Sequence, residues 1–298
     1  MAWSEVFELQ VQKFPYEFHL HGLSDLQIGS KDSSERVIQQ RLEEIVDDPV
    51  DSGTVILGDI EDEDRPSTRS IRKAAFAERP EVIDRDAEKH LAWIDKVIIP
   101  KLLPLQKTKY GIMGILAGHH YTQITPDLNS AQYICSRLSE LSKRKVPYLG
   151  IMSSFIDLRF RSNGKGIRVV GHLQHGEGGG QTKGSTLAKL DRTSQGFVAD
   201  FYMRAHDCQL VATKTDQLYP KESQANGHPD ILSRTITFLN LGSATQGYQP
   251  SKKDLSYVEN SMMRPTTMGW GSIFFRVRKA WAHEDPNQSY KIDTRVLI

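Results

Sequence analysis

The sequence predicts an α/β protein in which two β-sheets pack against each other. In the first half, short apolar runs alternate with segments of helical periodicity, the order typical of parallel strands joined by crossover helices. The second half is richer in strand-like runs, which predicts a second sheet packed on the first. The chain has 298 residues, enough to bury a large core, and shows neither an internal repeat nor a low-complexity linker. We therefore expect a single domain over residues 1–298.

Three strands and three helices are expected to alternate in the first half. The expected strands are 18–24, 54–57 and 111–117, and the expected helices are 33–47, 86–103 and 129–144. Asp32 and Glu35 fit a capping pair at the start of the first helix. A charged insertion near 60–83 interrupts the pattern, with an acidic run followed by a basic segment that could face a polyanion or simply solvent.

The second half reads as strands and glycine-containing loops. The expected strands are 147–152, 167–174, 197–203, 208–213, 232–240 and 272–280, and we treat 245–298 as a C-terminal extension. The glycine-rich run 176–183 lacks the spacing of a phosphate-binding P-loop, so we expect its glycines to let the backbone pass close to His175.

Composition narrows the range of partners and compartments. Lys and Arg number 38 against 37 Asp and Glu, a balance that does not favour bulk electrostatic binding to DNA or membranes. No apolar run approaches a membrane span, and the N-terminus lacks the pattern of a signal peptide. The two cysteines suit a reducing compartment. We expect a cytoplasmic protein without a membrane partner, and the oligomeric state stays open.

Polar residues follow five of the expected strands. In chain order they are Asp25 and Gln27, Asp59 after Gly58, His119 and His120 after Gly118, His175 before Gly176, and His206 and Cys208. In open α/β sheets, ligand sites form at the carboxyl ends of strands, so these residues point to one shared site. Carboxylate, imidazole and thiolate groups are ligands of zinc, iron and manganese.

The order of these motifs resembles that of the calcineurin-like metallophosphoesterases, which carry D-x-H, G-D, G-N-H-[DE], H and G-H-x-H at successive strand ends. The resemblance covers residues 18–210, and the stretch from Ser256 to Gly269 is similar to one in phage-encoded members. It implies a four-layer α/β/β/α sandwich of two mixed sheets flanked by helices. It also implies a phage-encoded protein acting inside a host cell.

The resemblance implies two positions for divalent transition metals, Mn, Zn or Fe. One would be held by Asp59, His119, His175 and His206, where His119 replaces the family's asparagine with a stronger ligand. The other would share Asp59 and use Asp25, Gln27 and Cys208. Both ligands special to that second position have changed type, because an amide and a thiol stand where the family has imidazoles. We therefore expect one well-built metal site and a weaker second.

His120 matches the family histidine that contacts phosphate or assists the leaving group, and Tyr121 stands where an acid usually follows it. The implied reaction is hydrolysis of a phosphodiester, in a nucleic acid or nucleotide, by a metal-activated water. The alternative is a catalytically degenerate member that binds nucleic acid or a protein. A third reading is mononuclear hydrolysis of an activated monoester.

Simpler explanations exist for single residues. Taken alone, Asp25 and Asp59 would be helix caps or turn residues. His172 faces the opposite side of its strand from His175, so we expect a structural or supporting role. His19 and His21 lie within the first strand, and we expect them to be hydrogen-bonded groups in or near the core.

Overall fold

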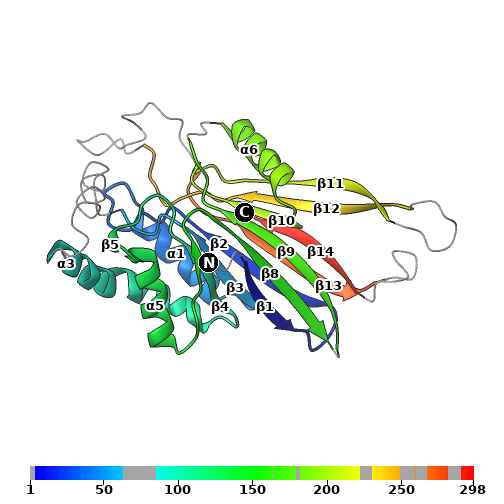
Figure 1. Cartoon of the computed structure of the whole chain (residues 1–298), viewed down its shortest axis with the longest axis horizontal. Helices are drawn as coiled ribbons and strands as arrows, with labels where there is room; N and C mark the ends of the chain where they lie inside the picture. The colour runs from blue at the N-terminus through cyan, green and yellow to red at the C-terminus, as the bar shows by residue number, and fades with distance from the viewer. Residues whose placement is uncertain are drawn as a thin grey trace.

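Two six-stranded sheets face each other in the computed structural model, which describes residues 4–62, 85–162, 164–178, 182–221, 230–248, 259, 267–280 and 290–298 (Figure 1). In spatial order the first sheet contains β1 (Ser4–Gln10), β8 (Ser153–Ser162), β9 (Lys165–Gln174), β10 (Phe201–Arg204), β12 (Asp230–Asn240) and β11 (Val211–Lys221). The second contains β14 (Tyr290–Leu297), β13 (Ser272–Lys279), β2 (Tyr16–Leu23), β3 (Ser52–Leu57), β4 (Gly111–Leu116) and β7 (Tyr148–Gly150).

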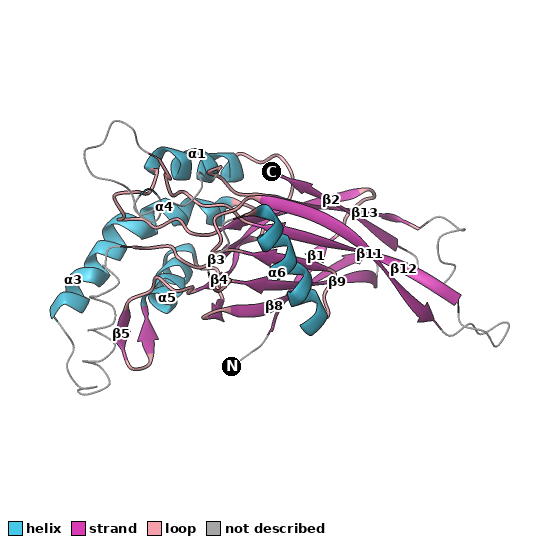
Figure 2. Ribbon diagram, turned by 90° about the horizontal axis from the view of Figure 1, so that it is seen from above, coloured by secondary structure: helices cyan, strands magenta, loops and turns pink. Residues whose placement is uncertain are grey.

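Helices cover the outer faces of the sheets, as Figure 2 shows from above. They are α1 (Glu35–Val46), α3 (Arg85–Trp93), a π-helical turn (Ile94–Ile98), α4 (Ile99–Leu102), a 3-10 helix (Leu103–Lys107), α5 (Ser130–Ser142) and α6 (Lys183–Gly196). A small hairpin, β5 (Gln123–Thr125) and β6 (Leu128–Asn129), precedes α5. This arrangement confirms the predicted sandwich of two mixed sheets flanked by helices.

Strand direction brings the predicted site residues to one edge. β2, β3, β4 and β7 pair in parallel, so the carboxyl ends of β2, β3 and β4 are neighbours. β9 and β10 are likewise parallel in the other sheet. Every residue of β3 and β4 is buried, which explains why both strands read as continuous apolar runs.

Aromatic side chains fill the space between the sheets. Phe18 of β2 meets Phe160 of β8 with ring centroids 6.0 Å apart. Phe275 of β13 meets Phe201 of β10 edge to face at 5.5 Å. These contacts join strands that are far apart in sequence into one core, and they hold the edge with the site residues in a fixed position.

Several elements differ from the expectations. The strands β1, β8 and β14 and the helix α6 were not predicted, because β1 and β14 alternate polar and apolar residues weakly and α6 buries only Thr186 and Leu190. The expected helix 86–103 is divided by the π-helical turn. α1 has Ser34 as its N-cap with no side-chain cap, so the predicted Asp32–Glu35 capping pair is wrong.

Two predicted segments lie wholly or largely outside the described residues. The insertion is described only up to Asp62, so its basic part is not covered, and the phage-like stretch falls mostly between 249 and 266. The described parts of 245–298 include β13, which pairs antiparallel with β2 inside the second sheet. Among the helices that the structure describes, none has both the length and the apolar character to cross a membrane.

Candidate metal centre

The predicted ligands lie in the turns that directly follow five strands. Asp25 follows β2, Asp59 follows β3, His119 follows β4, His175 follows β9, and His206 and Cys208 follow β10. The turns contact one another through their backbones, since the Asp25 amide donates to Gly58 O at 3.1 Å and the Asp59 amide donates to Ala117 O at 3.2 Å.

These turns hold unusual backbone conformations. Six non-glycine residues in the described part of the chain have positive φ, and five of them are predicted ligands: Asp25, Gln27, Asp59, His206 and Cys208. Each such residue costs on the order of 1–3 kcal/mol, and residues of this kind cluster at functional sites. The surrounding structure therefore maintains a geometry that the local chain does not favour.

Four of the seven predicted ligands converge on one point. A carboxylate oxygen of Asp59 and one ring nitrogen each of His119, His175 and His206 all lie within 4.8 Å of one another. The three imidazole centroids form a triangle with sides of 4.7, 5.0 and 5.2 Å. One carboxylate and three imidazoles form a donor set that suits a tightly held transition metal.

Backbone amides fix the orientation of the Asp59 carboxylate. Its Oδ1 accepts hydrogen bonds from the amides of His119 at 2.6 Å and His120 at 2.8 Å, which leaves Oδ2 facing His175 Nε2 at 3.2 Å. Gly118 makes this possible, because a Cβ there would lie 2.2 Å from Asp59 Oδ1 and its φ is +77°. Any larger residue at position 118 would therefore clash with the Asp59 carboxylate.

The buried imidazoles carry nitrogen atoms suited to a metal. His175 is fully buried, and its Nδ1 lies 2.6 Å from Leu57 O, which can only accept, so Nδ1 carries the proton in the neutral ring and Nε2 keeps a lone pair toward Asp59. This is the usual support for a metal-ligating histidine. His119 Nδ1 is buried with no hydrogen-bond partner. An unsatisfied imidazole nitrogen next to a buried carboxylate fits a metal site.

The pKa values of the four residues indicate which of them are charged in the metal-free cluster. Burial would raise the pKa of Asp59, but contact with His175 and the charge of His120 hold that pKa well below its usual range. Burial would lower the pKa of His175, yet Asp59 and Asp25 raise it to about 9. Burial lowers the pKa of His206 to about 4 and also lowers that of His119. A proton on His175 therefore supplies the positive charge that Asp59 attracts.

Of the other three predicted ligands, neither Asp25 nor Cys208 belongs to this converging group. Asp25 is buried, and its Oδ2 accepts the His206 amide at 3.2 Å; burial raises its pKa to about 6. The Gln27 side-chain oxygen accepts from the Thr245 hydroxyl at 2.9 Å. Cys208 Sγ donates to His206 O at 3.6 Å, and burial and the charge of Asp25 raise the pKa of this thiol in the metal-free protein. The second position therefore lacks the convergence seen around Asp59.

His120 has a carboxylate partner that the sequence analysis missed. Its Nδ1 lies 3.0 Å from Asp62 Oδ1, and its Nε2 lies 3.8 Å from Asp59 Oδ2. About a quarter of the His120 side chain is exposed, so solvent and ligands can reach it. Tyr121, where the family has an acid, is partly buried against the core instead. The sequence feature that could have indicated this partner is Asp62 itself, an acid three residues after Asp59.

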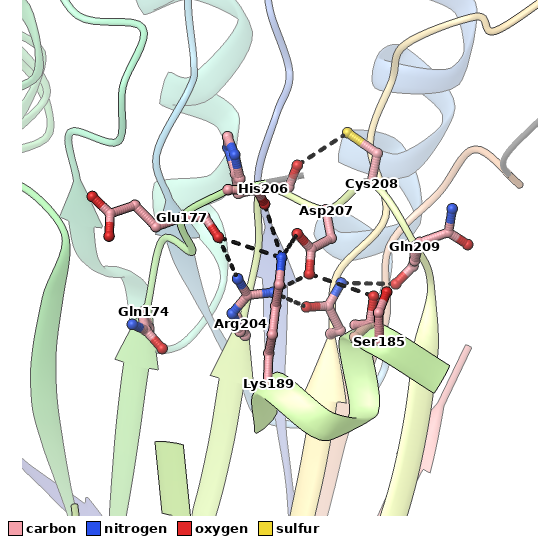
Figure 3. Close-up of polar contacts among 12 residues, drawn as sticks. Gln174, Glu177, Ser185, Lys189, Arg204, His206, Asp207, Cys208 and Gln209 are labelled. Carbon is pink, nitrogen blue, oxygen red and sulfur yellow. Dashed lines mark hydrogen bonds and ion pairs between the residues drawn. The ribbon is translucent and has the colours of Figure 1, made fainter. Parts of the chain in front are cut away.

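A buried ion network holds the turn that carries His206 (Figure 3). The carboxylate of Asp207 is fully buried, and it pairs with Arg204 and with Lys189 of α6, whose Nζ lies 2.8 Å away. Lys189 also donates to Gly178 O at 2.8 Å, and Arg204 Nη2 lies 3.4 Å from Glu177 O. The network thereby ties together the turns after β9 and β10 and helix α6, although none of its side chains is a predicted ligand.

Two expectations about neighbouring residues can be compared with the structure. His172 lies away from the cluster and stacks on Phe197 at 4.4 Å, in agreement with a structural role. Gly176 permits close packing after His175, because a Cβ there would meet Arg204 Nη2 at 2.2 Å.

Comparisons with known proteins give only distant matches: no protein-family model and no curated protein matches the sequence. Among solved structures, Vps29 from Entamoeba histolytica complexed with Zn²⁺ is 9% identical, with 93% of this chain and 98% of that chain covered and a TM-score of 0.34. A conserved uncharacterized protein from Streptococcus pneumoniae TIGR4, described as a predicted phosphoesterase, is 13% identical, with coverage of 94% and 98% and a TM-score of 0.33. GAP50, the anchor in the inner membrane complex of Plasmodium, is 9% identical, with coverage of 95% and 89% and a TM-score of 0.37. These matches are too distant to assign a family or an activity to this chain.

Proposed function

We propose that this chain is a metal-dependent phosphoric ester hydrolase with one strong metal position, formed by Asp59, His119, His175 and His206. The observation that carries the proposal is the convergence of one carboxylate and three imidazoles from four different strand ends. The buried, unpartnered Nδ1 of His119 supports it, because such an atom is costly unless a ligand satisfies it. The donor set fits Zn, Mn or Fe.

When bound there, the metal would lower the pKa of a water molecule and polarise a phosphoryl oxygen. Asp59 supplies the negative charge of the site, and the amides of His119 and His120 keep its carboxylate in place. His175 is held by Leu57 O so that Nε2 faces the site, and it must give up its proton before it can bind a metal.

His120 is the residue that we propose for proton transfer. It lies at the exposed edge of the cluster, and Asp62 holds its Nδ1 at 3.0 Å. With Nδ1–H bonded to Asp62, the ring presents Nε2 toward the cluster, where it can contact phosphate or give a proton to the leaving oxygen. General acid catalysis of this kind contributes about 10²–10⁴-fold to a rate.

A phosphodiester, in a nucleotide or nucleic acid, is our proposed substrate class. Arg204 and Lys189, the cations around the His206 turn in the described part of the chain, are committed to Asp207. A diester carries one negative charge and needs less cationic support than a monoester dianion. Its alkoxide leaving group also benefits from the proton that His120 would supply.

A catalytically degenerate binding module is the second candidate. It is favoured by the half of the predicted centre around Asp25, where Gln27 is engaged by Thr245 and the Cys208 thiol stays protonated. Such a protein would keep one metal and bind nucleic acid or a protein partner without hydrolysing it.

Metal content measured beside hydrolysis separates these candidates. Protein purified without chelator would be analysed for metals and assayed with bis(p-nitrophenyl) phosphate, p-nitrophenyl phosphate and a dinucleotide. The hydrolase proposal expects about one equivalent more of tightly held metal in the unmodified protein than in Asp59→Asn. It also expects faster turnover of the diesters, which is lost in Asp59→Asn. The matched control is Asp191→Asn, which changes an exposed acid on α6 and should leave both unchanged.

Metal without hydrolysis of any of the three substrates would instead support the binding module. Equal transition-metal content in the unmodified protein and the Asp59→Asn variant would overturn the metal site itself.

A further inference from the structure

A second cluster of metal-ligating side chains lies on β2, upstream of Asp25. We propose that His19, His21 and Asp48 form a site for a divalent metal of the zinc type, separate from the Asp59 centre. One ring nitrogen from each histidine and a carboxylate oxygen of Asp48 all lie within 4.8 Å of one another. His19 lies four residues before Leu23, the last residue of β2. At about 3.3 Å per residue, its backbone is therefore about 13 Å from the strand end that leads to Asp25.

The local structure explains why the three side chains meet. His19 and His21 are two residues apart on one strand, so both point to the same face of the sheet. That face is covered by α1, and Asp48 follows the end of this helix (Figure 2). The Val50 amide donates to Asp48 Oδ1 at 2.9 Å, which leaves Oδ2 directed at His19 Nδ1 at 2.5 Å and His21 Nε2 at 3.0 Å.

His21 has the surroundings of a metal-ligating histidine. It is 4% exposed, and its Nε2 makes no hydrogen bond, although it faces Asp48. Its other nitrogen, Nδ1, lies 2.8 Å from the hydroxyl of Ser272, which sits directly opposite on β13. The Ser272 hydroxyl can accept a hydrogen bond from Nδ1–H, and in that tautomer Nε2 carries the lone pair that would bind the metal.

Nearby charges permit a cation at this position. Arg41 lies on the Nδ1 side of His21, where it donates to Ser272 Oγ at 2.7 Å, and so it does not occupy the space between Nε2 and Asp48. Glu44 pairs with Arg41 at 3.2 Å and offsets its charge. The Asp48 carboxylate is therefore available to neutralise part of the charge of a bound ion.

The site would leave at least one coordination position open. Zinc–ligand bonds are about 2.0–2.2 Å long, so two ligand atoms of a tetrahedral zinc ion lie about 3.3 Å apart. Asp48 Oδ2 now lies 2.5 Å from His19 Nδ1, so the carboxylate would move away by less than about 1 Å on binding zinc. The three side chains line a cavity of about 600 Å³, together with Val37, Arg41, Leu210, Met268, Trp270 and Ile298. A water or a small carboxylate ligand could therefore complete the coordination from this cavity, as in zinc sites that exchange ligands.

The test uses the full chain carrying both Asp59→Asn and His206→Ala, which removes two of the four ligands of the Asp59 centre. After chelator treatment, Zn²⁺ is titrated by calorimetry and Co²⁺ by visible absorption, whose intensity reports tetrahedral coordination. We expect about one equivalent, lost in Asp48→Asn and kept in Glu43→Gln, which changes an exposed acid on the neighbouring helix α1. Ser272→Ala should weaken zinc binding by about 10–100-fold, because it removes only the partner of His21.

Zinc binding that survives Asp48→Asn, or that fails equally in Glu43→Gln, would overturn the proposal. Absence of any binding would show His19 and Asp48 to be an ordinary hydrogen-bonded pair. Circular dichroism checks that each variant is folded, and His21→Gln replaces Asp48→Asn if the latter does not fold. Because the readout is metal binding in a background without the Asp59 centre, failure of the phosphoesterase proposal would leave this result intact.

Discussion

The two halves of the predicted centre come from the same strand ends but differ in how they are built. Around Asp59, three imidazole nitrogens and a carboxylate oxygen converge, and backbone groups hold Asp59 and His175 in place. Around Asp25, the candidate ligands bind other protein groups: Asp25 accepts the His206 amide and Gln27 accepts the Thr245 hydroxyl. Both halves contain left-handed backbone, so backbone geometry alone does not make a metal site.

The chemistry of the donors explains the difference. The pKa values of His119 and His206 are lowered, so these two imidazoles are neutral at pH 7 and offer lone pairs once they are oriented. His175 must give up one proton to the solvent, and the Cys208 thiol must also lose its proton before it can bind a metal. Burial raises the pKa of Cys208 and opposes that loss. A metal ion would favour loss of the Cys208 proton only if the other ligands of this half held the ion strongly, and the amide of Gln27 is a weak ligand. The half around Asp59 is therefore the one that we expect to function.

Two residues on one turn offer the sharpest test of this comparison. We expect His206→Ala to weaken metal binding by more than about a hundredfold, beyond what losing an outer partner costs, and to abolish hydrolysis. Cys208→Ala, two residues away, should keep the metal and most of the activity, because a partly buried, protonated cysteine acts as a small apolar group. Metal analysis and turnover of bis(p-nitrophenyl) phosphate measure both. Equal losses in the two variants would mean that the halves act as one bimetallic unit.

The network around Asp207 should matter for stability more than for chemistry. Asp207→Asn leaves Arg204 without its buried counter-charge, and breaking a buried pair in this way costs about 3–5 kcal/mol. Urea unfolding of the metal-free protein measures the change in free energy. Asp191→Asn, an exposed acid on α6, should change the free energy of unfolding by less than about 0.5 kcal/mol. A similar small effect for Asp207→Asn would show that the network does not support the His206 turn.

Asp62 should affect rate without affecting metal content. We expect Asp62→Asn to lower kcat by about 10–100-fold, because His120 loses the partner that orients it and general acid catalysis weakens. The pH–rate profile should also change, which a purely structural role would not produce. Asp127→Asn, an exposed loop acid, is the control. An unchanged pH–rate profile in Asp62→Asn would argue against proton transfer by His120.

The smallest effect concerns pH and the metal-free protein. The pKa of His175 is raised from 6.5 to about 9, so the stability it contributes is complete below pH 6.5 and is lost as pH rises through about 9. The lowered pKa values of His119 and His206, and that of Asp25 near 6, affect stability below this window. The Tm of the metal-free protein should therefore fall between pH 6.5 and 9.

The slope of Tm over that window should flatten in His175→Gln. It should persist in His172→Gln, because the pKa of His172 is lowered to about 4 and its protonation acts only at lower pH. Bound metal should also remove the slope, since it takes the place of the proton on His175. A Tm that does not depend on pH over this range would mean that His175 and Asp59 are not an ion pair.

The sequence by itself determined the fold class and the strand ends from which the candidate site is built. Apolar runs such as β3 and β4 are readable because strands buried on both faces must be apolar throughout. The elements it did not reveal were those with weak patterns: α6 buries only Thr186 and Leu190, and β14 is mostly exposed or half-buried. Their structure depends on the sheets against which they pack.

Only the tertiary structure decided which candidate ligands meet. Motif order put Gln27, Asp59 and Cys208 at one site, and residue type already marked Gln27 and Cys208 as weaker ligands. The residue that engages Gln27, Thr245, is distant in sequence and could not be identified from local spacing. The same holds for the second cluster, where Asp48 meets His19 across 29 residues. Pairing of side chains depends on distance in space and on burial, and neither is encoded in local spacing.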